Sequence, residues 1–437
     1  MRLARTLRTV GGAVLAGAML FGTAPVAAAD ETRDAQWPLT SFLSDQVWQK
    51  STGKGVTVAV IDSAINGQHP DLQGNVLQGK SFIEGQRADQ ESTVDHGTSM
   101  ASIIAGHGHG PGNSAGVKGL APDAKILPVA LPVTGETVDS TDLGPAIRYA
   151  VDAGASVINM SIVPSSISSS EEEAIAYAFK KNVLLVAGSG NEGMRLGSLA
   201  SSPGVVAVGA VGENGRVWED SNHGSALMLT APGIHIRSAA ASRQYRQATG
   251  TSDSTAYVSA AAALLRSKFP DLTAGQIANR LVKTAGMPPG MESKNLPDPY
   301  YGYGFIRPLR ALTQDIPAGS KNGPLKAPEV QPSTGTGGAN AASGGSQQAG
   351  DKKDDGLSIG VVVGIAAGVL IVVVIIVVVV VSRQKNRRNG PPPGGPGGWG
   401  GPGGSGGAPY PPNAYQQQAG PPGAYPSYPP QQPPPPQ

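Results

Sequence analysis

A long uncharged apolar run near the C-terminus constrains this chain more than any other feature. Residues 357–381, LSIGVVVGIAAGVLIVVVIIVVVVV, contain no charged side chain. A helix of this length, rising about 1.5 Å per residue, crosses a hydrocarbon core of roughly 30 Å with some tilt. The sequence therefore predicts one transmembrane helix at 357–381.

The charges beside this run predict its orientation. Basic residues crowd the segment 382–388 directly after it, whereas 351–355 before it reads DKKDD and is of mixed sign. The positive-inside rule places such a basic cluster in the cytoplasm. We therefore expect the C-terminus to be cytoplasmic and the preceding part of the chain to lie outside the membrane.

The first residues have the features of a secretory signal. Three arginines precede the apolar run 10–21, and the alanines at 27–29 offer a small-residue cleavage site, so we expect 1–29 to be a cleaved signal peptide. The alternative is an uncleaved anchor helix, which the shortness of the apolar run disfavours. Export of the following domain agrees with the orientation deduced from the C-terminal charges.

Composition divides the rest of the chain. Residues 30–316 are long enough for a globular domain, and without cysteine that exported domain must be held by its own core. Residues 317–356 are rich in Gly, Pro, Ser and Ala and predict a flexible linker. Residues 382–437 predict a disordered Pro/Gly-rich tail. The net charge of +2, with no basic patch outside the juxtamembrane cluster, gives no support for nucleic-acid binding.

Two segments outside the globular part offer contacts to partners. The tail intersperses tyrosines among prolines, a pattern that docks into aromatic grooves, although a solvated tail without a dedicated partner fits as well. The first half of the membrane run carries three glycines spaced four residues apart, which make a smooth face suited to helix–helix pairing. The residues of that face are Gly360, Gly364 and Gly368.

Short apolar runs alternate with helical stretches across the globular part. The runs VTVAVID, KILPVAL, SVINMSI, NVLLVAGSG and VVAVGAV are typical of buried parallel strands. The stretch TAGQIANRLVKTA predicts a helix that Thr273 and Gln276 begin as a capping box. This alternation predicts an α/β fold with a mostly parallel sheet, in which reactive groups gather at the carboxyl ends of the strands.

Three residues suggest a nucleophilic site. Asp62 ends the first apolar run, His96 precedes a short helix, and Ser252 begins a helix of small residues. Singly, each suits a turn, a surface position or an N-cap. Together they supply what acyl transfer by a hydroxyl requires, namely a histidine that takes the proton and a carboxylate that orients the histidine. The order Asp, His, Ser is one known arrangement of this triad, and the helix after Ser252 favours the developing oxyanion.

Four motifs in the same order resemble the signature blocks of the subtilase family. They are VAVIDSAINGQHPDL, DHGTSMASIIAG, LLVAGSGNEG and GTSDSTAYVSAAAALL, and the likeness covers roughly residues 36–312. The resemblance implies a subtilisin-like fold and hydrolysis of peptide bonds. It also implies Asp62 as orienting carboxylate, His96 as general base and acid, Ser252 as nucleophile and Asn191 as the side-chain donor of an oxyanion hole.

Within that family the chain looks most like the mycosins, the membrane-anchored proteases that accompany type VII secretion systems. The segments QWPLTSFLSDQVWQKSTGKGVTVAVID and YGYGFIRPLRAL, together with the predicted signal and single membrane helix, carry this likeness. It implies the type VII secretion machinery as a partner. The short stretch between Ala29 and the first strand leads us to expect no folded propeptide.

No cofactor or metal is expected. His107 and His109 lie two residues apart in AGHGHGPG, but no third ligand accompanies them. A calcium loop of the Asp-x-Asp-x-Asp-Gly kind is absent from the sequence as well.

The segment NMSIVPSS at 159–166 departs from the family pattern, which has a Ser-Leu-Gly-Gly-like stretch there. We expect Ser161, Ile162 and Val163 to contact substrate, with side chains where the family presents bare backbone. Pro164 has no N–H to donate to a bound peptide. A slow protease restricted to small residues before the scissile bond follows from these changes.

Two functions of different class fit the sequence. The chain is an active endopeptidase facing the cell exterior, or a weakly active or inactive protease-like scaffold of a membrane secretion complex. Retention of all four reacting groups favours the enzyme, because a scaffold has no chemical need for them. Those groups are Asp62, His96, Asn191 and Ser252.

Overall fold

A seven-stranded sheet forms the centre of the part of the chain that the structure describes. The computed structural model describes residues 31–90, 93–134, 137–138, 141–290 and 295–329. The strands are ordered β12-β11-β10-β8-β1-β5-β2, and every neighbouring pair is parallel. The sheet consists of β1 (Thr57–Asp62), β2 (Lys80–Ser81), β5 (Lys125–Ala130), β8 (Val157–Met160), β10 (Leu184–Gly188), β11 (Val205–Val211) and β12 (Leu227–Pro232).

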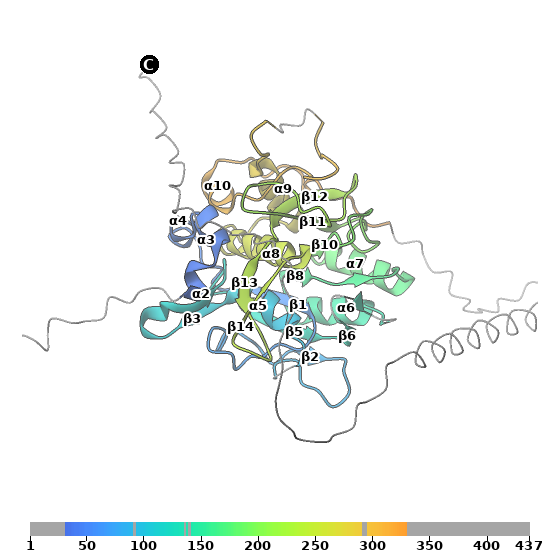
Figure 1. Ribbon diagram of the computed structural model, residues 1–437. Helices are drawn as coiled ribbons and strands as arrows, with labels where there is room; N and C mark the ends of the chain where they lie inside the picture. The colour runs from blue at the N-terminus through green and yellow to red at the C-terminus, as the bar shows by residue number, and fades with distance from the viewer. Residues whose placement is uncertain (1–30, 91–92, 135–136, 139–140, 291–294, 330–437) are drawn as a thin grey trace, which may run out of the picture. The chain divides into compact units, whose positions relative to one another are not determined.

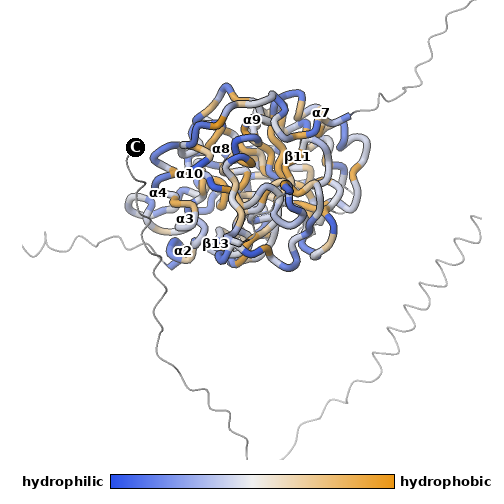
Figure 2. Tube along the Cα trace, turned by 90° about the horizontal axis from the view of Figure 1, so that it is seen from above, coloured by the Kyte–Doolittle hydropathy of each residue, from blue (hydrophilic) through white to orange (hydrophobic). Residues whose placement is uncertain are grey.

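Helices cover both faces of this sheet (Figure 1). One face packs against α5 (His96–Ala105), α8 (Thr251–Lys268) and α9 (Ala274–Thr284), and the other packs against α6 (Gly144–Asp152) and α7 (Ser169–Lys180). Side chains of a strand alternate between the faces, so Val58 and Val60 of β1 join the α8 core whereas Ala59 and Ile61 join the α6 core. Figure 2 shows apolar chain gathered around α8 and β11. The predicted α/β fold with a mostly parallel sheet and flanking helices is confirmed.

Smaller elements border the sheet. The strands β3 (His107–His109) and β4 (Ala115–Lys118) pair antiparallel, with η1 (Pro111–Asn113) between them. The strands β13 (Ile236–Ala239) and β14 (Tyr245–Ala248) form a second antiparallel pair. A third group orders β6 (Val133–Thr134), β7 (Thr137–Val138) and β9 (Val163–Pro164). The pairing of β7 with β9 fixes part of the segment that we expect to contact substrate.

The first described residues are an integral part of the fold. They form α2 (Glu31–Asp34), α3 (Trp37–Ser41) and α4 (Ser44–Trp48). The buried Gln36 amide exchanges two hydrogen bonds of 2.9 Å with the backbone of Lys118 in β4. The Arg33 guanidinium donates to the carbonyl oxygens of Gly116 and Ala115, at 2.8 and 3.1 Å. These contacts hold the N-terminal segment on the β3–β4 hairpin.

The packed chain extends beyond Ile316, where the sequence placed the start of the linker. After α10 (Pro308–Thr313), residues 317–325 lie along α9. Asn279 donates to the carbonyl oxygen of Pro317 at 3.2 Å, and Leu325 is buried. The capping box that begins α9 is present as predicted, with Thr273 and Gln276 bonded reciprocally.

Several predicted segments lie outside the described residues. They are the signal peptide 1–29, the end of the linker, the membrane helix 357–381 with its glycine face, and the tail 382–437. Within the described part of the chain, no helix combines the length and the apolar character needed to cross a bilayer.

Candidate active site

The Asp62 carboxylate and the His96 imidazole form a buried pair. Asp62 is the last residue of β1 and His96 the first of α5. Nδ1 of His96 lies 2.8 Å from Oδ1 and 2.9 Å from Oδ2 of Asp62, and the histidine is only 5% exposed. The Ser63 N–H donates to Asp62 Oδ1 at 2.7 Å and fixes the carboxylate. A carboxylate so placed keeps the proton on Nδ1 and leaves Nε2 as the basic nitrogen.

A glycine at the second position of α5 allows this approach of helix to strand. A Cβ on Gly97 would lie 2.3 Å from the carbonyl oxygen of Ser63. The Gly97 N–H instead donates to the Ser63 hydroxyl at 2.9 Å. Ala64, the next residue, is buried and has no left-handed backbone, so its methyl group causes no strain there.

Ser252 stands in the first turn of α8, almost fully buried. Its hydroxyl donates to the carbonyl oxygen of Ser161 at 3.1 Å, and the Ser161 hydroxyl donates to the carbonyl oxygen of Ser252 at 3.0 Å. Ser161 directly follows β8, the neighbour of β1 in the sheet, and α5 packs on α8. The sheet order therefore brings Asp62, His96 and Ser252 to the carboxyl ends of neighbouring strands, where the sequence predicts the reactive groups.

Asn191 lies on the loop after β10 and contacts the start of α8. Its Oδ1 accepts two hydrogen bonds of 2.9 Å, from the N–H and from the hydroxyl of Thr251. With the amide oxygen so engaged, the amide nitrogen is the donor that Asn191 offers beside Ser252. Backbone N–H groups in the first turn of a helix have no intrahelical partner, and the Ser252 N–H is one of them.

Sequence reasoning missed the residue that holds the Asn191 loop. Asn222 is 3% exposed, and its Oδ1 accepts from the N–H groups of Glu192 and Met194 at 3.1 and 2.8 Å. Its amide nitrogen donates to Glu192 Oε2 at 2.7 Å, and its backbone N–H donates to the Gly190 carbonyl. Gly190 has φ of +110°, and a Cβ there would meet the Asn222 amide at 2.2 Å. A single asparagine between turn residues has no sequence pattern that would reveal this role.

Two neighbouring side chains of the segment that we expect to contact substrate, Ile162 and Val163, differ in burial. Ile162 is 1% exposed and belongs to the core on the α6 face, so only its backbone is available for contact with substrate. Val163 is half-buried, and its Cγ1 lies 3.2 Å from the position that a Cβ on Gly197 would take. Gly197 donates to the carbonyl oxygen of Ser189 at 3.2 Å, which places Val163 opposite the segment leading to Asn191.

Asp95 anchors the start of α5 next to His96. Its Oδ1 accepts from the Ala241 N–H, the Ser242 N–H and the Ser242 hydroxyl at 2.8 to 2.9 Å, and Arg243 lies 3.5 Å from Oδ2. Burial alone would raise the pKa of Asp95, but these hydrogen bonds and the Arg243 charge together hold that pKa below its ordinary value.

The two histidines of AGHGHGPG have partners within the protein. His109 Nδ1 lies 2.6 Å from Oδ1 of the buried Asp71, and the His107 ring bonds the carbonyl oxygens of Gly108 and Gln73. In the part of the chain that the structure describes, no group of three or more His, Asp or Glu side chains is arranged to hold a metal ion.

Comparison with known proteins gives consistent relatives. The model of the Subtilase family matches residues 53–304. A thermophilic serine proteinase of Bacillus sp. strain AK1 is 33% identical over 272 residues, which cover 62% of this chain and 65%, just under two thirds, of that protein. Subtilisin Savinase of Lederbergia lenta is 35% identical over 258 residues, covering 58% of this chain and 90% of that protein.

A solved structure with the same fold is described as MycP1 from the ESX-1 type VII secretion system. It superimposes with a TM-score of 0.57 at 29% identity, covering 66% of this chain and 89% of that chain.

Proposed function

The chain belongs to the subtilase family of serine endopeptidases, with mycosins of type VII secretion systems as structural neighbours, and we propose that it hydrolyses peptide bonds through Asp62, His96 and Ser252. The buried contact of His96 Nδ1 with both oxygens of Asp62 carries this proposal. It leaves one ring nitrogen basic at the carboxyl ends of the strands, the side on which the first turn of α8 carries Ser252.

The first half of the reaction forms an acyl-enzyme. The Ser252 hydroxyl turns from the Ser161 carbonyl toward Nε2 of His96, gives up its proton there, and its oxygen attacks the substrate carbonyl carbon. Asp62 stabilises the imidazolium that results. The amide nitrogen of Asn191 and the N–H of Ser252 donate to the oxyanion.

The second half regenerates the enzyme. The His96 imidazolium protonates the leaving amine, which departs as the carbonyl re-forms on the Ser252 oxygen. A water molecule then attacks the acyl carbon while His96 takes its proton. Collapse of the second tetrahedral species returns that proton to Ser252 and releases the carboxylic acid.

Labelling by a fluorophosphonate probe tests the proposal. We expect the full-length protein to be labelled and to cleave peptides, and Ser252→Ala to lose both properties. The expected loss of turnover is on the order of a millionfold, the size known for subtilisin without its nucleophile. Ser267→Ala, which changes an exposed hydroxyl at the other end of α8, is the matched control. A folded protein that resists the probe would favour the scaffold function instead.

We further propose that the protease domain faces the cell exterior on a single membrane helix and works with a type VII secretion system. The predicted signal peptide 1–29 and apolar run 357–381 support the anchoring, and the MycP1 neighbour, which comes from the ESX-1 type VII secretion system, supports the association. Helix pairing in the membrane would use the face of Gly360, Gly364 and Gly368.

A further inference from the structure

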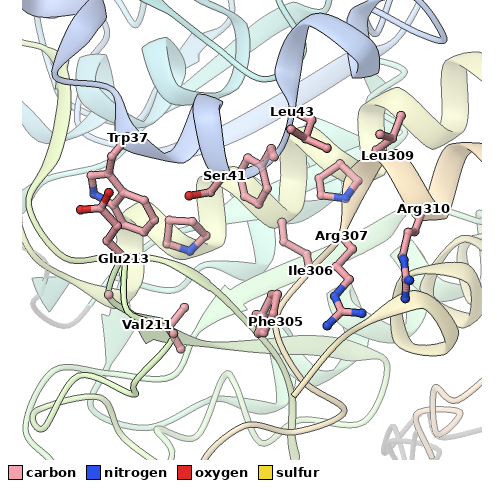
Figure 3. A pocket seen from close by; sticks show the side chains of 15 residues that line it. Trp37, Ser41, Leu43, Val211, Glu213, Phe305, Ile306, Arg307, Leu309 and Arg310 are labelled. Carbon is pink, nitrogen blue, oxygen red and sulfur yellow. The ribbon is translucent and has the colours of Figure 1, made fainter. Parts of the chain in front are cut away.

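A hollow of about 370 Å³ lies between the N-terminal helices and the segment 305–310 (Figure 3). None of the proposed catalytic residues lines it. Its wall is mainly apolar, and the ends of β11 and β12 close one side. The large apolar side chains of the wall are Trp37, Phe42, Leu43, Phe305, Ile306 and Leu309.

Two arginines stand side by side at one end of this hollow (Figure 3). The Arg307 guanidinium lies 4.9 Å from the centre of the Phe305 ring. It also lies against the backbone of Gly286, so close that a Cβ on Gly286 would be 1.8 Å from the guanidinium. Among the described residues, neither Arg307 nor Arg310 has a hydrogen-bonded or carboxylate partner for its side chain. Burial, and then the charge of Arg310, lower the pKa of Arg307. An anion bound between the two would relieve that repulsion.

The lip of the hollow holds an exposed leucine in a strained backbone. Leu43 is 52% exposed, and its φ of 56° is left-handed, which costs a non-glycine residue about 1 kcal/mol. It precedes α4, whose first-turn N–H groups of Gln46 and Val47 donate to its carbonyl oxygen. Glu213 lies with Trp37 at the end of the hollow opposite the arginines. The hollow is thus apolar in the middle, cationic at one end and open over Leu43.

We propose that this hollow is an exosite that binds a peptide segment of a partner protein, in which a large apolar side chain is followed by a carboxylate. The apolar side chain fills the space beside Leu43 and Phe305, and the carboxylate pairs with Arg307 and Arg310. Two adjacent guanidinium groups suit a carboxylate because each presents parallel N–H donors. The volume accommodates a few side chains, within the usual range for ligand sites. The inference does not depend on hydrolysis.

Binding to the full-length Ser252→Ala protein tests the exosite, because this variant leaves the probe uncleaved. The probes are two dye-labelled peptides, Ala-Phe-Leu-Glu-Glu-Ala and its Gln-Gln counterpart. We expect the Glu peptide to bind at least about tenfold more tightly, a difference of about 1.4 kcal/mol. In the Arg307→Gln/Arg310→Gln protein that preference should fall below about twofold.

Matched variants separate binding from folding. Arg87→Gln removes an exposed arginine paired with Asp89 and should keep the full preference. Arg310→Gln alone changes an exposed side chain without partners and should lose part of the preference even if the double variant fails to fold.

Three outcomes would overturn the exosite. The first is equal affinity of the Ser252→Ala protein, with both arginines intact, for the two peptides. Arginine-dependent binding of short-chain phosphatidylglycerol with no peptide preference is the second, and it would assign the hollow to a lipid. Self-association that Arg310→Gln abolishes, again with no peptide preference, would assign it to a second copy of the chain.

Discussion

Ser252 and Ser161 exchange hydrogen bonds in both directions, each hydroxyl donating to the other residue's carbonyl oxygen, at 3.1 and 3.0 Å. This pair ties the first turn of α8 to the end of β8. The Ser161 hydroxyl also accepts from the Asn159 amide at 3.0 Å, so it belongs to a buried polar chain. The position of the proposed nucleophile thus depends on a residue that performs no chemistry.

Ser161→Ala should impair catalysis out of proportion to stability. The substitution removes two buried hydrogen bonds, the one donated to the Ser252 carbonyl oxygen and the one accepted from the Asn159 amide, at about 1 kcal/mol of unfolding free energy each. The loosened Ser252 should lower kcat by roughly tenfold. Ser254→Ala is the control, because its buried hydroxyl also donates to a carbonyl, that of Ala231 at 2.9 Å, from the same helix. Equal kcat for the two variants, measured beside their denaturation midpoints, would contradict a positioning role for Ser161.

Asn222→Ala should lower kcat while leaving KM nearly unchanged. The substitution leaves the Glu192 and Met194 N–H groups without their acceptor, so the loop that presents Asn191 loses its support. Removal of an oxyanion donor costs about 10²- to 10³-fold in kcat, and we expect Asn222→Ala to lose about tenfold. Asn214→Ala, at an exposed turn, is the control.

A double-mutant cycle gives the decisive measurement for Asn222. In an Asn191→Ala background the loop no longer carries the donor, so Asn222→Ala should have little further effect on kcat. Full additivity of the two losses would show that Asn222 acts on another part of the site.

Asp95 should contribute stability that is lost in acid. Because the pKa of Asp95 is lower in the folded than in the unfolded protein, its contribution is present above the unfolded value, near 4, and disappears as pH falls through the folded value. Asp95→Asn should therefore reduce the melting temperature at neutral pH and flatten its decline below about pH 4. Parallel melting curves of both proteins across that range would refute the assignment.

Sequence patterns reveal features that repeat or that need a particular residue type. The strands were predictable because parallel strands buried on both faces become continuous β-branched runs, and the α9 cap because Thr273 and Gln276 have a fixed spacing. The packing of 317–325 was missed because a composition poor in apolar residues predicts that a segment is not packed. This segment is held largely by hydrogen bonds in which side chains of α9 donate to its backbone carbonyl oxygens. Whether the Ile162 side chain points into the core depends on which alternate residues of the chain face each side of the sheet. The preceding strand β8 has only four residues, too few for its sequence to reveal that alternation.

Membrane topology can be tested on intact cells. Protease added outside should remove the domain before Asp355 and spare a tag placed after Gln437, because the basic cluster that follows the predicted helix favours the cytoplasmic side. Cells permeabilised before digestion are the control and should lose the tag. Loss of the tag from intact cells would reverse the proposed orientation.

Substrate choice should depend on Val163. A peptide bound by strand addition obtains affinity from main-chain hydrogen bonds and specificity from pockets for its side chains. The Val163 side chain lies against Gly197, opposite the segment that leads to Asn191, and Pro164 has no N–H to donate to a bound peptide. We therefore expect slow cleavage after small residues such as Ala and rejection of aromatic ones.

Val163→Gly isolates the steric part of this effect. Removing the branched side chain should raise kcat/KM after Phe by about tenfold or more, since a few methyl groups in a pocket discriminate substrates by that amount. Ile162→Val is the matched control, because its side chain is buried in the core and should leave the preference unchanged. The measurement is a peptide library profiled with each protein, with Ser252→Ala as the blank. Fast cleavage after Phe or Tyr by the wild-type protein would place Val163 outside the substrate pocket, because a pocket narrowed by Val163 has no room for an aromatic ring.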